Sequence, residues 1–247
     1  MQFHEFGNAS NPPVLLMHGM MQDWHTEYEM LQPLEEHYRL IIPAQDGFYE
    51  GSGDFSCFAD QAAQVEAYVQ AHYDGKLHGA YGCSQGGLML TELLTRNQID
   101  LGTVIMDGCY VARQGKIAGY VTYKMFCKLK NTGKFPALIM VMMKLMGLKA
   151  EDLGMMDQLY MQASDETVKR NFMENYTYRV RPELAAATSM VHLWCGSKEP
   201  YAIKSHNILK KYLKHYQEGI MQGLGHGEFL LKHQAEICQK ILQTLGA

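Results

Sequence analysis

Short apolar runs alternate with segments of helical periodicity along much of the chain. Residues 14–17 and 38–42 have the length and composition of buried strands. Residues 58–72 instead place apolar side chains at intervals of three and four, as an amphipathic helix does. The predicted strands are 14–17, 38–42, 76–83, 101–106, 189–195 and 216–221, and the predicted helices are 26–37, 58–72, 85–96, 202–213 and 229–245. This alternation predicts an α/β fold, with a mostly parallel central sheet and helices on both faces.

The alternation stops between about residues 110 and 181, where the strand signal disappears. Helical, methionine-rich sequence takes its place, with methionines at positions 140, 142, 143, 146, 155, 156 and 161. We therefore expect one α/β core, formed by residues 1–109 and 188–247, with a helical cap or lid inserted at residues 110–187.

Composition and charge narrow the class of protein. Hydrophobic residues make up 47% of the 247 positions and charged residues 19%, as in a folded domain with a sizeable core. The net charge is −4, and basic residues occur only in scattered pairs such as Lys210-Lys211, so no nucleic-acid partner is predicted. The apolar stretch 136–143 is far shorter than the roughly 20 residues of a membrane span, and residues 1–7 lack the pattern of a signal peptide.

The six cysteines are widely spread and form no C-x-x-C pair. That spacing predicts neither a zinc site nor a disulfide scaffold, and it favours reduced thiols in a cytoplasm. The cysteines are Cys57, Cys83, Cys109, Cys127, Cys195 and Cys238.

The strongest motif is Gly82-Cys83-Ser84-Gln85-Gly86, at the junction of a predicted strand and a predicted helix. A nucleophile at such a turn has a strained backbone, and flanking glycines remove Cβ atoms that would collide with the neighbouring elements. Ser84 is the candidate nucleophile, although a Gly-Ser turn without chemistry is the simpler alternative. We interpret Cys83, a rival nucleophile, as a small buried hydrophobic residue.

A second segment, residues 15–21, reads as a buried strand followed by His18-Gly19. Such a loop typically supplies half of an oxyanion hole. We expect the backbone N–H groups of Met20 and Gln85 to be the two donors, and His18 to have a structural role.

A serine nucleophile needs a base and an acid that orients the base. Among eleven histidines, His226 stands out because it lies in a glycine-rich loop after the last predicted strand. Glu199, which follows the strand 189–195, is the preferred acid, and Asp107 at the end of the strand 101–106 is the alternative. The order Ser84, Glu199, His226 is the one expected when a nucleophile elbow precedes its partners.

These motifs together resemble the α/β-hydrolase fold superfamily, specifically its small serine hydrolases with a helical cap. The resemblance rests on five stretches of sequence, which are His18-Gly19, Pro43 with Asp46-Gly47, residues 82–87, residues 196–200 and residues 225–227. It implies a sheet of about eight strands with the active site at their carboxyl ends, and it implies that the insertion is a lid. Relatives more often carry Asp where this chain has Glu199.

The expected activity is hydrolysis of a carboxylic ester with an apolar acyl or aryl group, without a metal or an organic cofactor. The expected partner is a small-molecule substrate, and the sequence specifies no oligomeric state. Gly19, Trp24 and Tyr110 are candidate pocket residues. The methionines of the cap suit a deformable apolar pocket, or equally the ordinary core of a helical cap.

The resemblance also leaves other functions open. Relatives include peptidases, thioesterases, lactonases and ligand receptors that retain the triad. A peptidase that acts on a free amine would want carboxylates in the cap, and the sequence offers Glu151, Asp152 and Asp157 there.

Overall fold

The computed structural model describes residues 1–132 and 161–246. Its strands are β1 (Gln2–Phe6), β2 (Pro13–Met17), β3 (Arg39–Ala44), β4 (Gly79–Cys83), β5 (Thr103–Asp107), β6 (Val191–Gly196) and β7 (Tyr216–Met221). Its α-helices are α1 (Trp24–Leu31), α2 (Phe58–Tyr73), α3 (Gln85–Arg96), α4 (Lys116–Thr132), α7 (Asp165–Thr177), α8 (Pro200–Leu209), α9 (Glu228–Lys232) and α10 (Gln234–Leu245). Two 3-10 helices, η1 (Gln32–Glu36) and η3 (Pro182–Ala186), complete the described elements.

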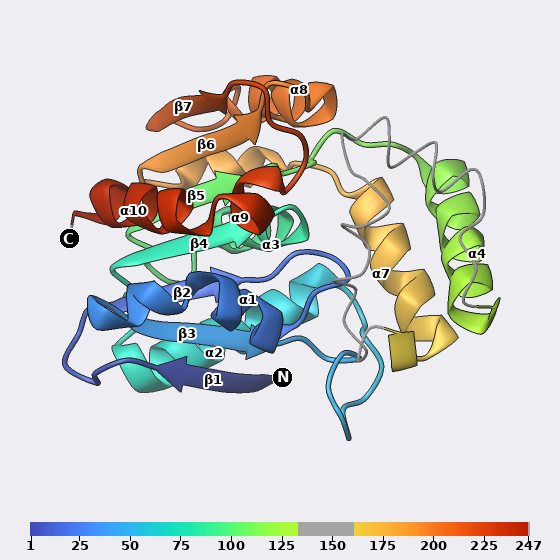
Figure 1. Ribbon diagram of the computed structural model, residues 1–247, viewed down its shortest axis with the longest axis horizontal. Coiled ribbons are helices and arrows are strands. Elements are labelled where there is room, and N and C mark those ends of the chain that lie inside the picture. Colours follow the sequence, from blue (N-terminus) through green and yellow to red (C-terminus); the bar gives the residue numbers. More distant parts are fainter. Residues whose placement is uncertain (133–160, 247) are drawn as a thin grey trace.

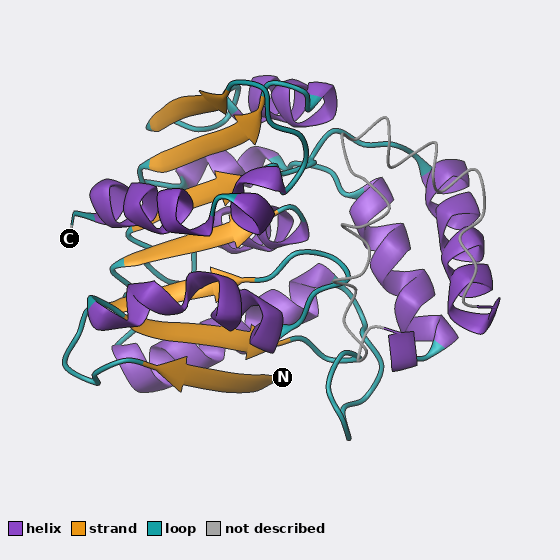
Figure 2. Ribbon diagram, viewed as in Figure 1, coloured by secondary structure: helices purple, strands orange, loops and turns teal. Residues whose placement is uncertain are grey.

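The strands form one sheet in the order β1-β3-β2-β4-β5-β6-β7 (Figure 2). β1 runs antiparallel to β3, and every other pair is parallel. The predicted α/β fold is therefore confirmed, with seven strands in the described part of the chain where about eight were expected. Parallel strands bring their carboxyl ends to one edge of the sheet, so the loops after β2, β4, β5, β6 and β7 share that edge.

Each face of the sheet buries its own core. Leu15 and Met17 of β2 belong to one cluster, whereas Val14 and Leu16 belong to the other, because alternate side chains of a strand point to opposite faces. Figure 1 shows α1, α9 and α10 covering one face and α2 and α3 covering the other. All four of these β2 side chains are completely buried, which explains why the strand reads as a continuous apolar run.

The structure departs from the predicted series of elements at three places. β1 was not predicted, because its residues Gln2–Phe6 mix polar and apolar side chains at a sheet edge. The helix predicted at 26–37 divides into α1 and η1, since Pro33 has no N–H to continue the α-helical hydrogen bonds. The helix predicted at 229–245 divides into α9 and α10 at His233, whose φ of −128° and ψ of 45° are not helical.

The described part of the insertion consists mainly of α4, α7 and η3. Figure 1 shows α7 and α4 beyond the carboxyl ends of the parallel strands, with α4 outermost. The two helices pack together through aromatic side chains, with the ring centroids of Phe126 and Phe172 5.5 Å apart. Of the methionines named above, only Met161 lies within the described residues, and the three cap carboxylates at positions 151, 152 and 157 lie outside them. None of the described helices is long and apolar enough to cross a membrane.

Candidate active site

The turn between β4 and α3 has the strained backbone that its glycines predict. Ser84 has a φ of 53° and a ψ of −112°, values that a residue with a side chain seldom adopts. A Cβ on Gly86 would lie 1.9 Å from the carbonyl oxygen of Met17, and one on Gly82 would lie 2.5 Å from the backbone of Gly86. Only glycine therefore fits at both positions, and α3 begins in direct contact with the end of β2.

Three loops bring Ser84, His226 and Glu199 into a continuous chain of hydrogen bonds. The Nε2 atom of His226 lies 2.9 Å from the Oγ atom of Ser84, and its Nδ1 atom lies 2.7 Å from Oε2 of Glu199. Ser84, His226 and Glu199 follow β4, β7 and β6 respectively, so the site joins one loop from the first half of the chain to two loops near its end. Ser84 remains partly exposed, whereas the imidazole and the carboxylate are buried.

The carboxylate of Glu199 is held by donors on both oxygens. The backbone N–H of Gly196 donates to Oε1 at 2.6 Å, and His226 donates to Oε2. Burial by itself would raise the pKa of Glu199, but the hydrogen bond and the charge of His226, together with the other donors, hold that pKa below its ordinary value. Glu199 is therefore ionised, and it can orient the imidazole and stabilise its protonated form.

The loop after β2 lies against the start of α3. Its Gly19 N–H donates to Oε1 of Gln22 at 3.1 Å, and the Nδ1 atom of His18 donates to the Gly19 carbonyl oxygen at 3.0 Å. Among the described residues, the backbone N–H groups of Met20 and Gln85 donate to no acceptor. The contact of Gln22 with this loop was not predicted from the sequence.

Comparison with known proteins finds a match to the part of the chain that contains Ser84. Residues 12–109, which include the loop after β2 and the serine turn, match the family model of the α/β hydrolase fold. The chain has the α/β-hydrolase fold.

Several solved structures resemble the whole chain. A protein assigned to the α/β-hydrolase family from Desulfitobacterium hafniense is 21% identical, with a TM-score of 0.85 over 99% of this chain and 100% of its own. An esterase from Exiguobacterium antarcticum is 16% identical, with a TM-score of 0.78 over 99% and 95% of the two chains. An enol-lactonase from Burkholderia xenovorans is 14% identical, with a TM-score of 0.75 over 100% and 96%. A search of curated proteins found no match. Identities this low establish the fold, and the chemistry has to be argued from the residues.

Tyr110 contacts both the histidine and the acid, and these contacts were not predicted from the sequence. Its hydroxyl donates to Oε2 of Glu199 at 3.2 Å, and its ring stacks on the imidazole of His226 with centroids 4.5 Å apart and an interplanar angle of 22°. Gly108 makes room for this arrangement, because a Cβ there would lie 3.0 Å from both the Oε2 of Glu199 and the Nδ1 of His226.

Asp107, the alternative acid, occupies a different place. Its carboxyl is buried and accepts a hydrogen bond from the hydroxyl of Tyr81 at 3.3 Å, and it makes no hydrogen bond to His226 among the described contacts. Burial, followed by the charge of Glu199, raises the pKa of Asp107 to about 7. The geometry therefore favours Glu199 over Asp107 as the partner of the histidine.

Trp24, a candidate pocket residue, contacts the edge strand β1 at the start of α1. Its indole stacks on the ring of His4 with centroids 3.7 Å apart, because α1 begins beside the edge strand β1. Cys83 is buried, and burial raises the pKa of its thiol well above the ordinary value, so it stays neutral as expected of a core residue.

The side chain of Gln85 joins the start of α3 to two other segments. Its Nε2 donates to Oε1 of Gln45 at 3.1 Å, and its Oε1 accepts from Nδ2 of Asn175 on α7 at 2.7 Å. These contacts tie α7 to the serine turn, and nothing in the sequence around Asn175 signals them. No three or more His, Cys, Asp or Glu residues in the described part of the chain are placed to hold a metal ion.

Proposed function

We propose that the protein is a serine hydrolase that cleaves carboxylic ester bonds through an acyl-enzyme intermediate. The observation that carries the proposal is the hydrogen-bonded series from Ser84 through His226 to Glu199, with heavy-atom distances of 2.9 and 2.7 Å. A hydroxyl, a base and an orienting carboxylate in this order are the groups that activate a serine for attack on a carbonyl.

The reaction would proceed in two steps. The Ser84 oxygen attacks the ester carbonyl while His226 takes its proton at Nε2, and the carbonyl oxygen becomes an oxyanion near the free N–H groups of Met20 and Gln85. The same imidazole then gives the proton to the departing alcohol. Water, deprotonated by His226, next hydrolyses the acyl-serine and restores the enzyme.

We propose an ester with an apolar acyl or aryl group as the substrate. Supporting this choice, Met20 and Met21 adjoin the proposed oxyanion site and pack against the hydrophobic core, and the insertion is rich in methionine. A lactone is an ester closed into a ring, so a lactonase activity would use the same attack. The free state of all six cysteines supports a reducing compartment such as the cytoplasm.

Labelling with a fluorophosphonate, followed by peptide mapping, tests the nucleophile. We expect modification at Ser84, its loss in Ser84→Ala and its retention in Cys83→Ala, which removes the neighbouring thiol. His226→Ala should reduce the labelling rate strongly, because the hydroxyl then has no base. Labelling of another residue in the wild-type protein would contradict the proposal.

A panel of p-nitrophenyl esters of increasing chain length, together with simple lactones, tests the substrate class. On the best substrate, Glu199→Ala should lower kcat by about 10⁴-fold, whereas Asp107→Asn should have a much smaller effect. Turnover of none of these compounds by a protein that still labels at Ser84 would remove the ester assignment and leave the nucleophile intact.

A further inference from the structure

The segment that contains the first half of the insertion carries a charge opposite to that of the rest of the chain. Residues 108–150 contain eight Lys and Arg residues and no Asp or Glu. Removing those eight from the 22 basic residues leaves 14 against 26 acidic residues elsewhere, a formal charge of −12. The overall charge of −4 therefore hides two regions of opposite sign.

Helix α4 displays part of this basic segment together with exposed apolar side chains. Ile117, Tyr120 and Val121 are 83%, 48% and 41% exposed. Large apolar side chains are seldom left this exposed in adjacent positions unless another surface covers them. The exposed lysines of the same helix are Lys116, Lys124 and Lys128.

The exposed positions of α4 recur at intervals of three and four residues, so they share one face of the helix. The opposite side, which includes Tyr123, Phe126 and Leu129, is buried. On the exposed face, the Nζ atom of Lys124 lies 5.6 Å from the centre of the Tyr120 ring, so basic and aromatic groups are interleaved. We call this exposed surface the α4 face, made up of Lys116, Ile117, Tyr120, Val121, Lys124 and Lys128.

The α4 face lies at the periphery of the molecule. Figure 1 shows α7 between α4 and the sheet, and α4 is the outermost element beyond the carboxyl ends of the parallel strands. α4 is therefore separated from the acidic core of the fold by α7.

We propose that the α4 face docks on the surface of an anionic phospholipid bilayer. Ile, Val and Tyr side chains enter the boundary between headgroups and acyl chains, and neighbouring lysines bind phosphate, which is the pattern of helices that lie in a membrane interface. Three apolar side chains alone bind weakly, so the lysines make the docking depend on negative lipid charge. The acidic remainder is repelled by the same surface, which orients the protein with α4 toward the lipid. This docking does not depend on the proposed chemistry at Ser84.

Flotation of the purified full-length protein with lipid vesicles tests the proposal. We expect binding to vesicles of phosphatidylcholine with roughly one-third phosphatidylglycerol, weaker binding to pure phosphatidylcholine, and a loss of binding as salt is raised. The variant K116E/K124E/K128E should bind anionic vesicles at least about tenfold more weakly. K76E/K211E/K214E is the matched control, since it changes the net charge equally at exposed lysines outside α4 and repels the same vesicles through its net charge alone.

A second pair of variants tests the apolar contribution. Ile117→Ser with Val121→Ser should weaken binding to anionic vesicles, whereas Ile220→Ser, which removes an exposed isoleucine on β7, should not. Circular dichroism and the Tm of each variant show whether it is folded. If a Lys→Glu variant is unfolded, the corresponding Lys→Gln variant is used in its place. Equal binding to neutral and anionic vesicles, or equal losses in the α4 variant and its matched control, would overturn the proposal. Retention on duplex DNA with none on vesicles would overturn it in favour of a nucleic-acid partner.

Discussion

At the scale of single residues, Tyr110 shows how one side chain can act on two others. Its hydroxyl donates a hydrogen bond to the carboxylate of Glu199, and its ring stacks on the imidazole of His226. The first contact lowers the pKa of Glu199, since a hydrogen bond to the carboxylate favours the charged form. The second restricts the orientation of the imidazole. We therefore propose that Tyr110 is a positioning residue for the reaction.

The two contacts can be separated by substitution. Tyr110→Phe keeps the ring and removes the hydroxyl, so we expect kcat/KM to fall by about tenfold, the equivalent of one hydrogen bond to a charged group. Tyr110→Leu removes the ring as well, and kcat/KM should fall by roughly a further tenfold. In both variants the pKa of Glu199 rises, the imidazole becomes more basic, and the acid limb of the pH–rate profile moves to higher pH.

Tyr201→Phe provides the control for these substitutions. Its ring lies 6.4 Å from that of Tyr110 and is half exposed, so it should leave both kcat/KM and the pH profile unchanged. A Tyr110→Phe enzyme with reduced kcat/KM but an unshifted acid limb would show that the hydroxyl acts on something other than the charge of Glu199.

At the scale of elements, the sequence predicted those whose pattern is local. α3 and β7 begin and end at the predicted residues, because the serine turn and the flanking loops mark their limits. The edge strand β1 was missed, since half of its pairing surface faces solvent and its sequence lacks an apolar run. A strand that forms only by pairing with a distant segment, as β1 does with β3, has a weak pattern in its own sequence.

The candidate site likewise contains residues that the sequence predicted and residues that it did not. Ser84, Glu199 and His226 could be picked out because each lies in a recognisable loop at the end of a strand. Asn175 was not predicted, and Tyr110 was predicted only as a pocket residue, because their contacts with Gln85 and Glu199 span 90 and 89 positions of sequence. Such contacts depend on how the insertion packs on the core. The local sequence pattern does not indicate that packing.

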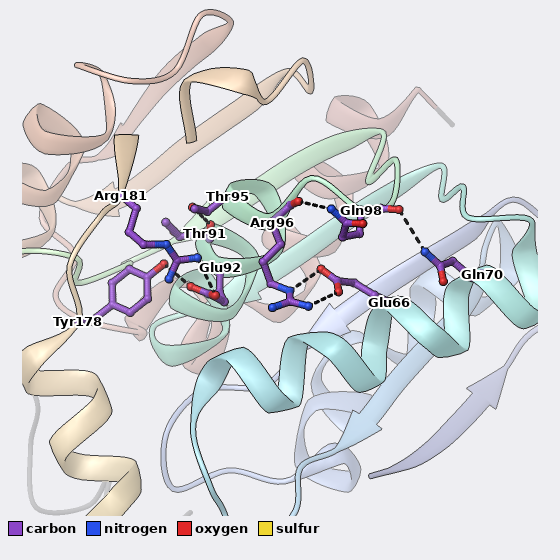
Figure 3. Close-up of polar contacts among 9 residues, drawn as sticks. All are labelled: Glu66, Gln70, Thr91, Glu92, Thr95, Arg96, Gln98, Tyr178 and Arg181. Atoms are coloured by element: carbon purple, nitrogen blue, oxygen red, sulfur yellow. Dashed lines mark hydrogen bonds and ion pairs between the residues drawn. The ribbon is translucent and has the colours of Figure 1, made fainter. Parts of the chain in front are cut away.

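A buried carboxylate links the end of the insertion to the core at α3. Glu92 accepts hydrogen bonds from the hydroxyl of Tyr178 at 3.1 Å and from Nη2 of Arg181 at 2.9 Å (Figure 3). Its side chain is 2% exposed, whereas that of Arg181 is 45% exposed. One turn farther along the same helix, Arg96 binds Glu66 of α2 through two hydrogen bonds of 2.8 Å. Ion pairs therefore connect α3 to the end of the insertion, through Arg181, and to α2, through Glu66 (Figure 3).

We expect Glu92→Ala to lower the free energy of unfolding by about 2–4 kcal/mol. The substitution leaves the buried hydroxyl of Tyr178 without its acceptor and removes the partner of Arg181. Glu166→Ala is the control, because that carboxylate pairs with Arg170 on the exposed surface of α7 and should cost less than about 1 kcal/mol. Urea unfolding at neutral pH measures both. Equal losses in the two variants would mean that the buried link contributes no more than a surface pair.

At the scale of the whole molecule, two buried carboxyl groups make stability depend on pH. Glu27 of α1 is fully buried, and neither of its oxygens has a hydrogen-bond partner among the described residues. Burial, with a smaller contribution from the charge of Asp107, raises the pKa of Glu27 to about 8, and Asp107 itself has a pKa of about 7. Both groups are therefore protonated in the folded protein at pH values where the unfolded chain has already lost these protons.

The sign of the effect follows from the bound protons. Between about pH 5 and 8 the folded state holds the proton of Glu27 and the unfolded state does not, so stability falls as pH rises, by about 1.4 kcal/mol per pH unit for this group. Four histidines act in the opposite direction below their ordinary pKa of 6.5, because partial or full burial lowers the pKa of each. They are His4, His18, His192 and His206. The contribution of Glu27 is therefore best isolated as a difference between variant and wild type.

Glu27→Gln keeps the shape of the side chain and removes its titration. The free energy of unfolding of this variant, measured relative to wild type by urea titration, should increase by about 1.4 kcal/mol for each pH unit between pH 6 and 8. Glu29→Gln, at an exposed position of the same helix, should give a difference that does not vary over that range. If the Glu27→Gln difference is equally constant, the carboxyl is ionised in the folded protein at pH 6, and a partner for that charge must then exist inside the fold.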